Sequence, residues 1–433
     1  MAKQELRDRN LCERSAKQRN RTSKAVLMMS TLPIRPIGPE YSTPVLGYTL
    51  DKFLKSGWSV YFLAGFEPVF DEVLEQQIHI TWFGGSLIRR LRVIGDTVRK
   101  VGFFARLIWW IVAQFQFLTK GLRIIKMYNI DLIYTWDVIS VPAAWFLSKL
   151  FGIPWVARYL GTWVPLPGKA KCFWKFRFWQ EILAYSLPAD LLIMTNDGTR
   201  GDHILRALGI DMNKVRFWKN GLDWCQFSKL PSPQEARMAL GLNHKYILLS
   251  ISRLVGWKRV DRIIRGIKGV VGEFPDVLLV IVGDGPDRRR LECLVSEIGV
   301  EEHVRFEGAI PRTEIPKYLA AADIFVILYD WSNVGNTLLE AMMAGKCIVT
   351  LNSGDTGYLI KNGENGILLE YEDLPRLPEI IKMLLTNDAL RNRLGYNARK
   401  SVGEHFWSWE ERLDAEIKEI ERLVKEKQRW RGE

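Results

Sequence analysis

Two cations stand close together after an apolar run in the second half of the 433-residue chain. Arg253 and Lys258 flank a predicted strand-to-helix turn that follows residues 246–252. Such a turn presents backbone N–H groups and the positive end of a helix, and an arginine can bind two phosphate oxygens at once. The pair is therefore suited to a diphosphate. Two solvated surface cations are the competing interpretation when the turn is taken alone.

Further turns in the same half could add to this site. Val282–Pro286 joins a strand end to a helix through glycines, which permit close backbone approach, although a plain strand-to-helix turn explains it alone. Gly335 and Asn336 open another helix, with Glu340 a little over one turn inside it. A buried carboxylate there needs donors, which the sugar hydroxyls of a nucleotide supply. Otherwise Glu340 is an acid on the helix surface.

Short β-rich runs alternate with longer helical patterns, and the alternation restarts after the Pro- and Ser-containing stretch 229–234. Strands that alternate with helices form βαβ units and a mostly parallel sheet, here twice. We predict an α/β chain of two doubly wound, Rossmann-like domains that face a central cleft, where ligands bind in such folds. The predicted strands are 25–30, 58–63, 77–81, 131–135, 154–159, 190–195, 214–218, 246–252, 277–282, 303–307, 323–328 and 347–350.

Composition excludes several classes of protein. The chain is 48% hydrophobic and 25% charged, which is typical of globular domains, and its length fits two of them. Five scattered cysteines without a CxxC pair predict neither a disulfide scaffold nor a cysteine zinc site, and they favour a reducing compartment. No GxGxxG, P-loop or HExxH motif occurs, and the five histidines show no ligand spacing. We expect no bound metal and no cofactor.

Taken together, the motifs resemble those of the family 4 glycosyltransferases of the GT-B fold, over about residues 24–425. The second half contains R-L-V-x-x-K from Arg253, V-G-D-G-P from Val282, V-x-F-x-G from Val304, A-D from Ala322 and L-E-A-M-x-A-G-K from Leu339. N-G-L-D from Asn220 is similar to the segment that closes the family's first domain, and F-W-S-W from Phe406 is similar to its aromatic return motif.

The resemblance implies a retaining, metal-independent transfer of a sugar from a nucleoside-diphosphate donor. It places the donor on the second domain and the acceptor on the first. The acceptor would attack from the leaving-group side, and a donor phosphate oxygen would take the proton. The resemblance implies diphosphate contacts for Arg253 and Lys258 and a ribose contact for Glu340. The other implied donor-side residues are Gly285, Phe306 and Ile310 near the base, and Gly335, Asn336 and Thr337 near the phosphates and sugar.

These interpretations predict that the chain is divided into four segments. Residues 1–23 are either a disordered basic arm or an artefact of the chosen start codon. Residues 24–227 form the acceptor-binding domain and 228–403 the nucleotide-sugar-binding domain. Residues 404–433 form a C-terminal helix that crosses back to the first domain, read as one charged helical pattern from Glu404 to Arg431.

The chain departs from the family pattern at two positions. Ser332 stands where the family has the first of two glutamates, so either this serine or Asp330 would contact the donor sugar. Leu160 stands where the family often has a histidine. Arg158 and Thr162 are candidates to line the cleft there, with a structural role as the alternative.

Two more segments are candidates for the acceptor side of the cleft. Asn196 and Asp197 lie in a polar segment after the sixth predicted strand, where Asp197 could equally be the N-cap of a helix. Gly38 lies in residues 35–40, which correspond by resemblance to the family's glycine loop near the acceptor.

Positive charge gathers in the first half. Residues 1–227 hold 31 Lys and Arg against 18 Asp and Glu, a balance of +13, whereas residues 228–433 hold 30 against 31, a balance of −1. Basic and aromatic residues interleave in 89–126 and 163–181, which favours elements on an anionic membrane surface. The alternative is a solvated helix whose aromatic side chains pack inward. No nucleic-acid motif accompanies the charge, so we expect no nucleic-acid partner.

We therefore expect a cytoplasmic protein, peripheral on the inner face of a membrane, whose acceptor is lipid-linked or a surface glycan. The apolar run 103–118 has 16 residues and includes Arg106, whereas a membrane span needs about 20 apolar residues. Two alternatives to a transferase stay open: a non-catalytic GT-B partner protein at the membrane, and a sugar-nucleotide epimerase or hydrolase.

Overall fold

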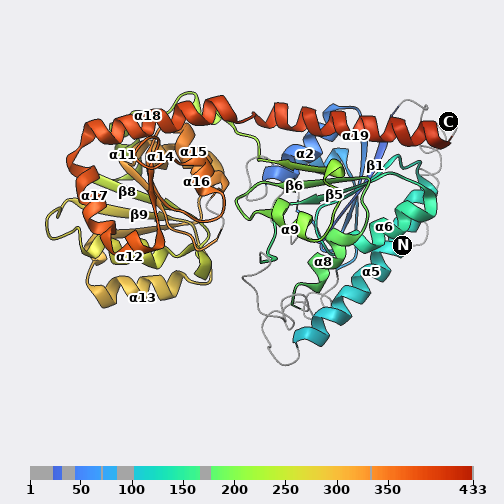
Figure 1. Ribbon diagram of the computed structural model, residues 1–433, viewed down its shortest axis with the longest axis horizontal. Helices are drawn as coiled ribbons and strands as arrows, with labels where there is room; N and C mark the ends of the chain where they lie inside the picture. The colour runs from blue at the N-terminus through green and yellow to red at the C-terminus, as the bar shows by residue number, and fades with distance from the viewer. Residues whose placement is uncertain are drawn as a thin grey trace.

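The computed structural model describes residues 23–31, 44–69, 72–84, 102–165, 177–331 and 334–431. Gly38, Ser332 and the predicted arm up to residue 22 lie outside these ranges. In the described part of the chain, two all-parallel sheets are present, one in each half (Figure 1). The predicted α/β fold class is therefore confirmed.

The N-terminal sheet has seven strands in the order β3-β2-β1-β4-β5-β6-β7 within the described residues. Its strands are β1 Ala25–Ser30, β2 Ser59–Ala64, β3 His79–Trp82, β4 Leu132–Thr135, β5 Trp155–Tyr159, β6 Leu191–Thr195 and β7 Val215–Trp218. Both faces are covered, so β1 and β6 are buried along their whole length. The helices of this half are α2 Pro44–Lys55, α3 Glu72–Gln77, α5 Gly102–Met127, α6 Val141–Phe151, α8 Trp179–Ser186, α9 Gly201–Ala207 and α10 Trp224–Phe227.

The C-terminal sheet has six strands in the order β10-β9-β8-β11-β12-β13, again among the described residues. Its strands are β8 Tyr246–Ile251, β9 Val277–Val282, β10 Val304–Gly308, β11 Ile324–Ile327, β12 Cys347–Leu351 and β13 Ile367–Leu369. All twelve predicted strands are present; β13 was not predicted, because three residues carry no periodic pattern. The helices of this half are α11 Pro233–Leu240, α12 Val260–Lys268, α13 Arg288–Ile298, α14 Ile315–Ala321, α15 Asn336–Met343, α16 Thr356–Leu359, α17 Leu377–Thr386 and α18 Asp388–His405.

The C-terminal helical pattern, predicted as continuous from Glu404, is in fact two helices. Helix α18 ends at His405, and α19, Trp409–Arg431, begins after three residues and returns along the N-terminal sheet (Figure 1). Ser408 causes the break, because its hydroxyl accepts from the Glu411 N–H at 3.2 Å while the Glu411 carboxylate accepts from the Ser408 N–H at 2.8 Å. The apolar face of α19 enters the same core as β1 and β2.

A buried ionic cluster fastens α19 to the sheet. Glu416 Oε2 lies 2.9 Å from Arg158 Nη1 and 2.8 Å from Arg412 Nη1, and Tyr134 donates its hydroxyl proton to the same carboxylate. Burial by itself would raise the pKa of Glu416, but the two guanidinium groups hold it below its ordinary value. Arg158, a candidate cleft residue, is 1% exposed and faces α19. Its role is therefore structural, which corrects that expectation.

Candidate functional site

The loops at the carboxyl ends of the two sheets contact each other. Asn220 Nδ2 donates to Asn336 Oδ1 at 3.0 Å, and Arg200 Nε lies 3.0 Å from Asp355 Oδ1. A Cβ added to Gly198 would lie 3.3 Å from the side chain of Val334. The candidate residues after β8, β9 and β11 therefore lie opposite those after β5 and β6.

Lys258 is held between two aromatic rings. It ends the short 3-10 helix Gly256–Lys258 after β8, and its Nζ lies 3.6 Å from the ring centroid of Tyr329 and 4.1 Å from that of Trp257. Burial lowers the pKa of Lys258 to about 7, a fall that Asp197 opposes and Arg253 increases. Arg253 itself is exposed to solvent in the turn that follows β8. A bound diphosphate would restore the full charge of this lysine.

The two predicted phosphate-side turns are locked together by glycine. Gly283 has a φ of +128°, and a Cβ there would lie 1.9 Å from the carbonyl oxygen of Ser252. A Cβ at Gly285 would lie 2.2 Å from the carbonyl oxygen of Leu254. No side chain fits at either position, so these glycines let the turns after β8 and β9 pack against each other.

Glu340 is buried on α15, and only one of its two carboxylate oxygens accepts a hydrogen bond from the described residues. Its side chain is 4% exposed, and its Oε1 accepts from Arg312 Nε at 3.3 Å and Nη2 at 3.2 Å. Its Oε2 is buried and, within the described chain, accepts no hydrogen bond. Burial raises the pKa of Glu340, and Arg312 opposes the rise. An acid on the helix surface is therefore excluded, and an orphaned buried acceptor requires a donor such as a hydroxyl.

A polar link that was not predicted from the sequence connects this glutamate to the N-terminal half. Arg312 lies in the 3-10 helix Arg312–Glu314, and its charge also acts on Tyr48 of α2. Tyr48 donates its hydroxyl proton to Asp223 Oδ2 at 2.8 Å. Burial raises the pKa of Tyr48 well above its ordinary value, and Asp223 adds to the rise. In the sequence, only Pro311 and Arg312 after the V-x-F-x-G motif marked this position, and they did not show that Arg312 contacts Glu340.

Asp197 faces Lys258 from the N-terminal half. Burial raises the pKa of Asp197 to about 6, although Thr199 donates to it from its hydroxyl at 2.6 Å and its N–H at 3.1 Å. Gly161, with a φ of +103°, leaves room for this carboxylate, because a Cβ there would lie 2.3 Å from Asp197 Oδ2. Thr162 is buried and donates its N–H to Thr199 Oγ1 at 3.1 Å. Thr162 thus holds Thr199, which in turn binds the Asp197 carboxylate.

The other candidate residues in the described ranges lie in both halves of the chain. Asn336 is bonded to Asn220 of the other half, and Asn196 has a buried Oδ1 that accepts no hydrogen bond from the described residues. Phe306 lies beneath the guanidinium of Arg288, 5.8 Å away, and Ile310 packs against the core. No cluster of three or more His, Cys, Asp or Glu in the described ranges could hold a metal ion.

Comparison with known proteins gives a family match for the second half of the chain. Residues 234–401, which include every donor-side candidate, match the family described as glycosyl transferases group 1. The second half of the chain therefore matches the group 1 glycosyl transferases. This confirms the predicted family 4 resemblance, and it explains why β8, β9, β11 and α15 carry the motifs that were recognised.

Several curated proteins are similar to part of this chain. The GDP-mannose-dependent alpha-(1-6)-phosphatidylinositol monomannoside mannosyltransferase of Mycolicibacterium smegmatis is 29% identical over 44% of this chain and 52% of its own. The N-acetyl-alpha-D-glucosaminyl L-malate synthase of Bacillus anthracis is 32% identical over 37% and 42%. The chain thus spans about half the length of the curated relatives it matches.

Solved structures are similar to this chain over nearly its whole length. The Anabaena Alr3699/HepE structure in complex with UDP and glucose aligns with a TM-score of 0.69 at 19% identity, over 92% of this chain and 99% of that one. Sucrose-phosphate synthase from Thermosynechococcus elongatus aligns with a TM-score of 0.69 at 19% identity, over 93% and 99%. At these identities the alignments establish the shared two-sheet GT-B fold.

Proposed function

We propose that this group 1 glycosyl transferase moves a sugar from a nucleoside-diphosphate donor to a glycan or a lipid-linked acceptor, with retention at the anomeric carbon. The observation that carries the proposal is the orphaned, buried Oε2 of Glu340 on the same sheet edge as Lys258. A ribose hydroxyl would satisfy the carboxylate, and the diphosphate would meet the cation. The named activity of the Mycolicibacterium smegmatis relative, which uses GDP-mannose, supports this class of donor.

In the proposed reaction, the bond between the anomeric carbon and the diphosphate breaks as the acceptor oxygen bonds to that carbon. Negative charge then develops on the leaving diphosphate. In this proposal, Lys258, Arg253 and the N–H groups at the start of α15 would stabilise that charge. By family resemblance, the acceptor attacks from the leaving-group side and its proton passes to a donor phosphate oxygen.

Loss of either cation or of the carboxylate tests the proposal. We expect Arg253→Ala, Lys258→Ala and Glu340→Ala each to abolish turnover of whichever UDP-, GDP- or ADP-sugar raises the melting temperature of the wild type. Lys245→Ala and Glu297→Gln, both at exposed positions of the same half, are the matched controls. Turnover that survives all three site changes, or a wild type stabilised by none of these donors, would contradict the proposal.

We also propose that helix α5 meets an anionic membrane surface. Trp109, Ala113 and Phe117 pack into the core, so part of the aromatic content faces inward. On the other side of the same turns of the helix, Ile108, Ile111 and Phe115 are 50%, 53% and 64% exposed. An exposed apolar stripe next to exposed cations supports a lipid-facing role. The neighbouring exposed cations on α5 are Arg106, Arg123 and Lys126.

The membrane proposal concerns a helix that lies on the bilayer, since no helix in the described ranges combines the length and apolarity that crossing would require. Flotation with liposomes of phosphatidylcholine and phosphatidylglycerol tests it. We expect binding at low salt that weakens in the variant Ile108→Ser/Ile111→Ser. Tyr396→Ser, an exposed position on α18, should leave flotation unchanged. Protein that stays in the soluble fraction at low salt would contradict the proposal.

A further inference from the structure

One tryptophan of the N-terminal half is exposed although the segment that carries it is fixed. Trp163 follows β5 and is 58% exposed, whereas its neighbours Thr162 and Val164 are buried. Val164 donates its N–H to Thr162 Oγ1 at 3.1 Å, and Tyr185 donates its hydroxyl proton to the same oxygen at 3.1 Å. The backbone at Trp163 is therefore held in place, and packing into the core does not account for its indole.

The indole of Trp163 contacts the C-terminal half. Its ring lies 5.7 Å from that of Trp257 at an interplanar angle of 83°, the edge-to-face arrangement that aromatic pairs favour. Trp257 makes a second contact of this kind with Tyr329, at 6.0 Å and 77°. The Nζ of Lys258 lies over the rings of Trp257 and Tyr329. A continuous set of ring contacts therefore leads from the N-terminal half to this lysine.

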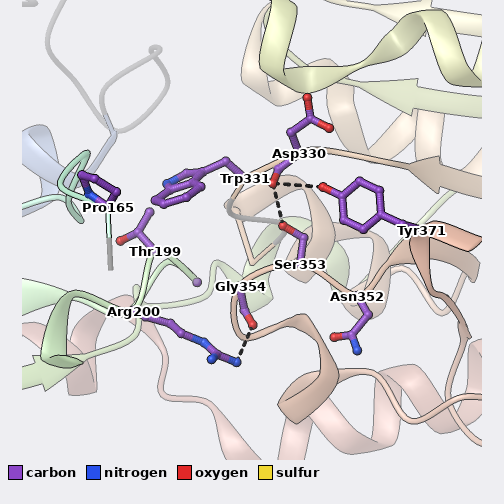
Figure 2. A pocket seen from close by; sticks show the side chains of 10 residues that line it. Pro165, Thr199, Arg200, Asp330, Trp331, Asn352, Ser353, Gly354 and Tyr371 are labelled. Carbon is purple, nitrogen blue, oxygen red and sulfur yellow. Dashed lines mark hydrogen bonds between the residues drawn. The ribbon is translucent and has the colours of Figure 1, made fainter. Parts of the chain in front are cut away.

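Hydrogen bonds within the C-terminal half fix the backbone of Trp257. Asp330 donates its N–H to the carbonyl oxygen of Trp257 at 3.0 Å. The carbonyl oxygen of Asp330 in turn accepts from the hydroxyl groups of Ser353 and Tyr371, at 3.0 and 3.5 Å (Figure 2). These bonds hold the main chain. The direction of the Trp257 indole depends instead on the side chains that it contacts.

The tryptophan pair forms only while the two halves are together. Another link between the halves is the hydrogen bond from Arg200 Nη2 to the carbonyl oxygen of Gly354, at 3.0 Å (Figure 2). The chains are so close there that a Cβ at Gly354 would lie 2.0 Å from the carbonyl oxygen of Gly198. Because Trp163 and Trp257 belong to different halves, their contact depends on the same approach.

The orientation of the Trp257 ring matters for the lysine. A cation is attracted to the face of an aromatic ring, so a rotation of the indole would remove this attraction from Lys258. Trp163 packs against the indole and opposes such a rotation. We propose that Trp163 is a positioning residue, which acts through Trp257 to hold the Lys258 ammonium in place for a diphosphate. The inference rests on the proposed transferase function and adds a residue of the N-terminal half to its donor side.

Calorimetric titration of the full chain with UDP, GDP and ADP tests the inference. Affinity for whichever nucleotide binds the wild type should be about fivefold weaker in Trp163→Leu, as expected for the loss of one edge-to-face aromatic pair. Trp163→Phe keeps a ring and should recover most of the affinity. Trp82→Leu changes another exposed tryptophan of the same half and should bind as the wild type does. The urea midpoint of Trp163→Leu should stay close to that of this control.

Double-mutant cycles separate positioning from other roles of Trp163. Since it acts through Trp257 and Lys258, Trp163→Leu should weaken binding by less than about twofold when combined with Trp257→Leu or with Lys258→Met. A fivefold loss that persists in Lys258→Met, by about the same factor, would mean that Trp163 contacts the ligand itself and would overturn the inference. Equal affinities of Trp163→Leu and the wild type would overturn it as well. Failure of the transferase proposal is seen separately, as a wild type that binds none of the three nucleotides, and it would remove the inference with it.

Discussion

Arg312 donates two hydrogen bonds to a single oxygen of Glu340, from Nε at 3.3 Å and from Nη2 at 3.2 Å. The second oxygen of the carboxylate, Oε2, is buried without a partner among the described residues. The arginine therefore orients the glutamate and opposes the rise that burial causes in its pKa, while the second oxygen accepts no hydrogen bond from the described residues. This arrangement ties the proposed ribose contact to a residue outside the motifs that identified the family.

Replacement of Arg312 tests this relationship. In Arg312→Ala the pKa of Glu340 should rise further, because burial already raises it and the opposing cation is gone. We expect nucleotide affinity at pH 7 to fall about tenfold by calorimetry, with partial recovery in Arg312→Lys. Arg289→Ala, an exposed arginine without an assigned contact, is the control. Unchanged affinity in Arg312→Ala would mean that the arginine does not orient Glu340 for the ligand.

The pKa of Lys258, about 7, predicts a pH dependence of diphosphate binding. The protonated form attracts the diphosphate, so affinity should fall as pH rises from 6 to 9. Binding at pH 8 should take up protons, which calorimetry in buffers of different ionisation enthalpy measures. Lys258→Met should bind weakly and without this pH dependence. A wild type with equal affinity at pH 6 and pH 9 would contradict the assignment.

The same lysine affects folding stability in a defined direction. Its pKa is lower in the folded protein than the ordinary value of 10.5, so the unfolded chain binds more protons between about pH 7 and 10.5. The contribution of Lys258 to stability therefore becomes more favourable as pH rises through that window. Lys258→Met should raise the midpoint of urea unfolding most at pH 6 and least at pH 10. A change in the urea midpoint that does not vary with pH would argue against a Lys258 charge that burial disfavours in the folded protein.

Asp197 should set the protonation of Lys258 across the two halves. Each charge favours the ionised form of the other, so Asp197→Asn removes a group that raises the pKa of Lys258. The pH midpoint of nucleotide affinity should then move below that of the wild type. Asp202→Asn, in the first turn of the helix α9 that follows, should leave the midpoint in place. An unchanged midpoint in Asp197→Asn would show that the two charges are not coupled in solution.

The buried cluster under α19 predicts a large loss of stability. Glu416→Gln leaves Arg158 and Arg412 buried without their counter-charge, which is expected to cost ~3–5 kcal/mol of unfolding free energy. Hydrogen exchange should increase along residues 409–431. Glu426→Gln, about half exposed on the same helix, is the matched control. Equal urea midpoints for Glu416→Gln and the control would contradict a structural role for this carboxylate.

Local patterns in the sequence predicted most of the fold, because strands and turns depend on neighbouring residues. The motif around Arg253 and Lys258 and the position of Glu340 were found this way. Partners far apart in the chain were not predictable. Glu416 lies 258 residues from Arg158, and that distant partner is what turned a candidate cleft residue into part of the core. The ion pair between Arg200 and Asp355 likewise depends on how the halves meet.

The two chain segments that join the halves run side by side and are bonded to each other. Leu222 donates its N–H to the carbonyl oxygen of Trp407 at 3.0 Å, and Trp409 donates to that of Leu222 at 3.2 Å. Both covalent connections therefore act as one hinge, which leaves rotation about it as the motion that strains them least. Such a rotation would separate Arg200 from Asp355, whereas the hydrogen bonds at Leu222 would remain intact.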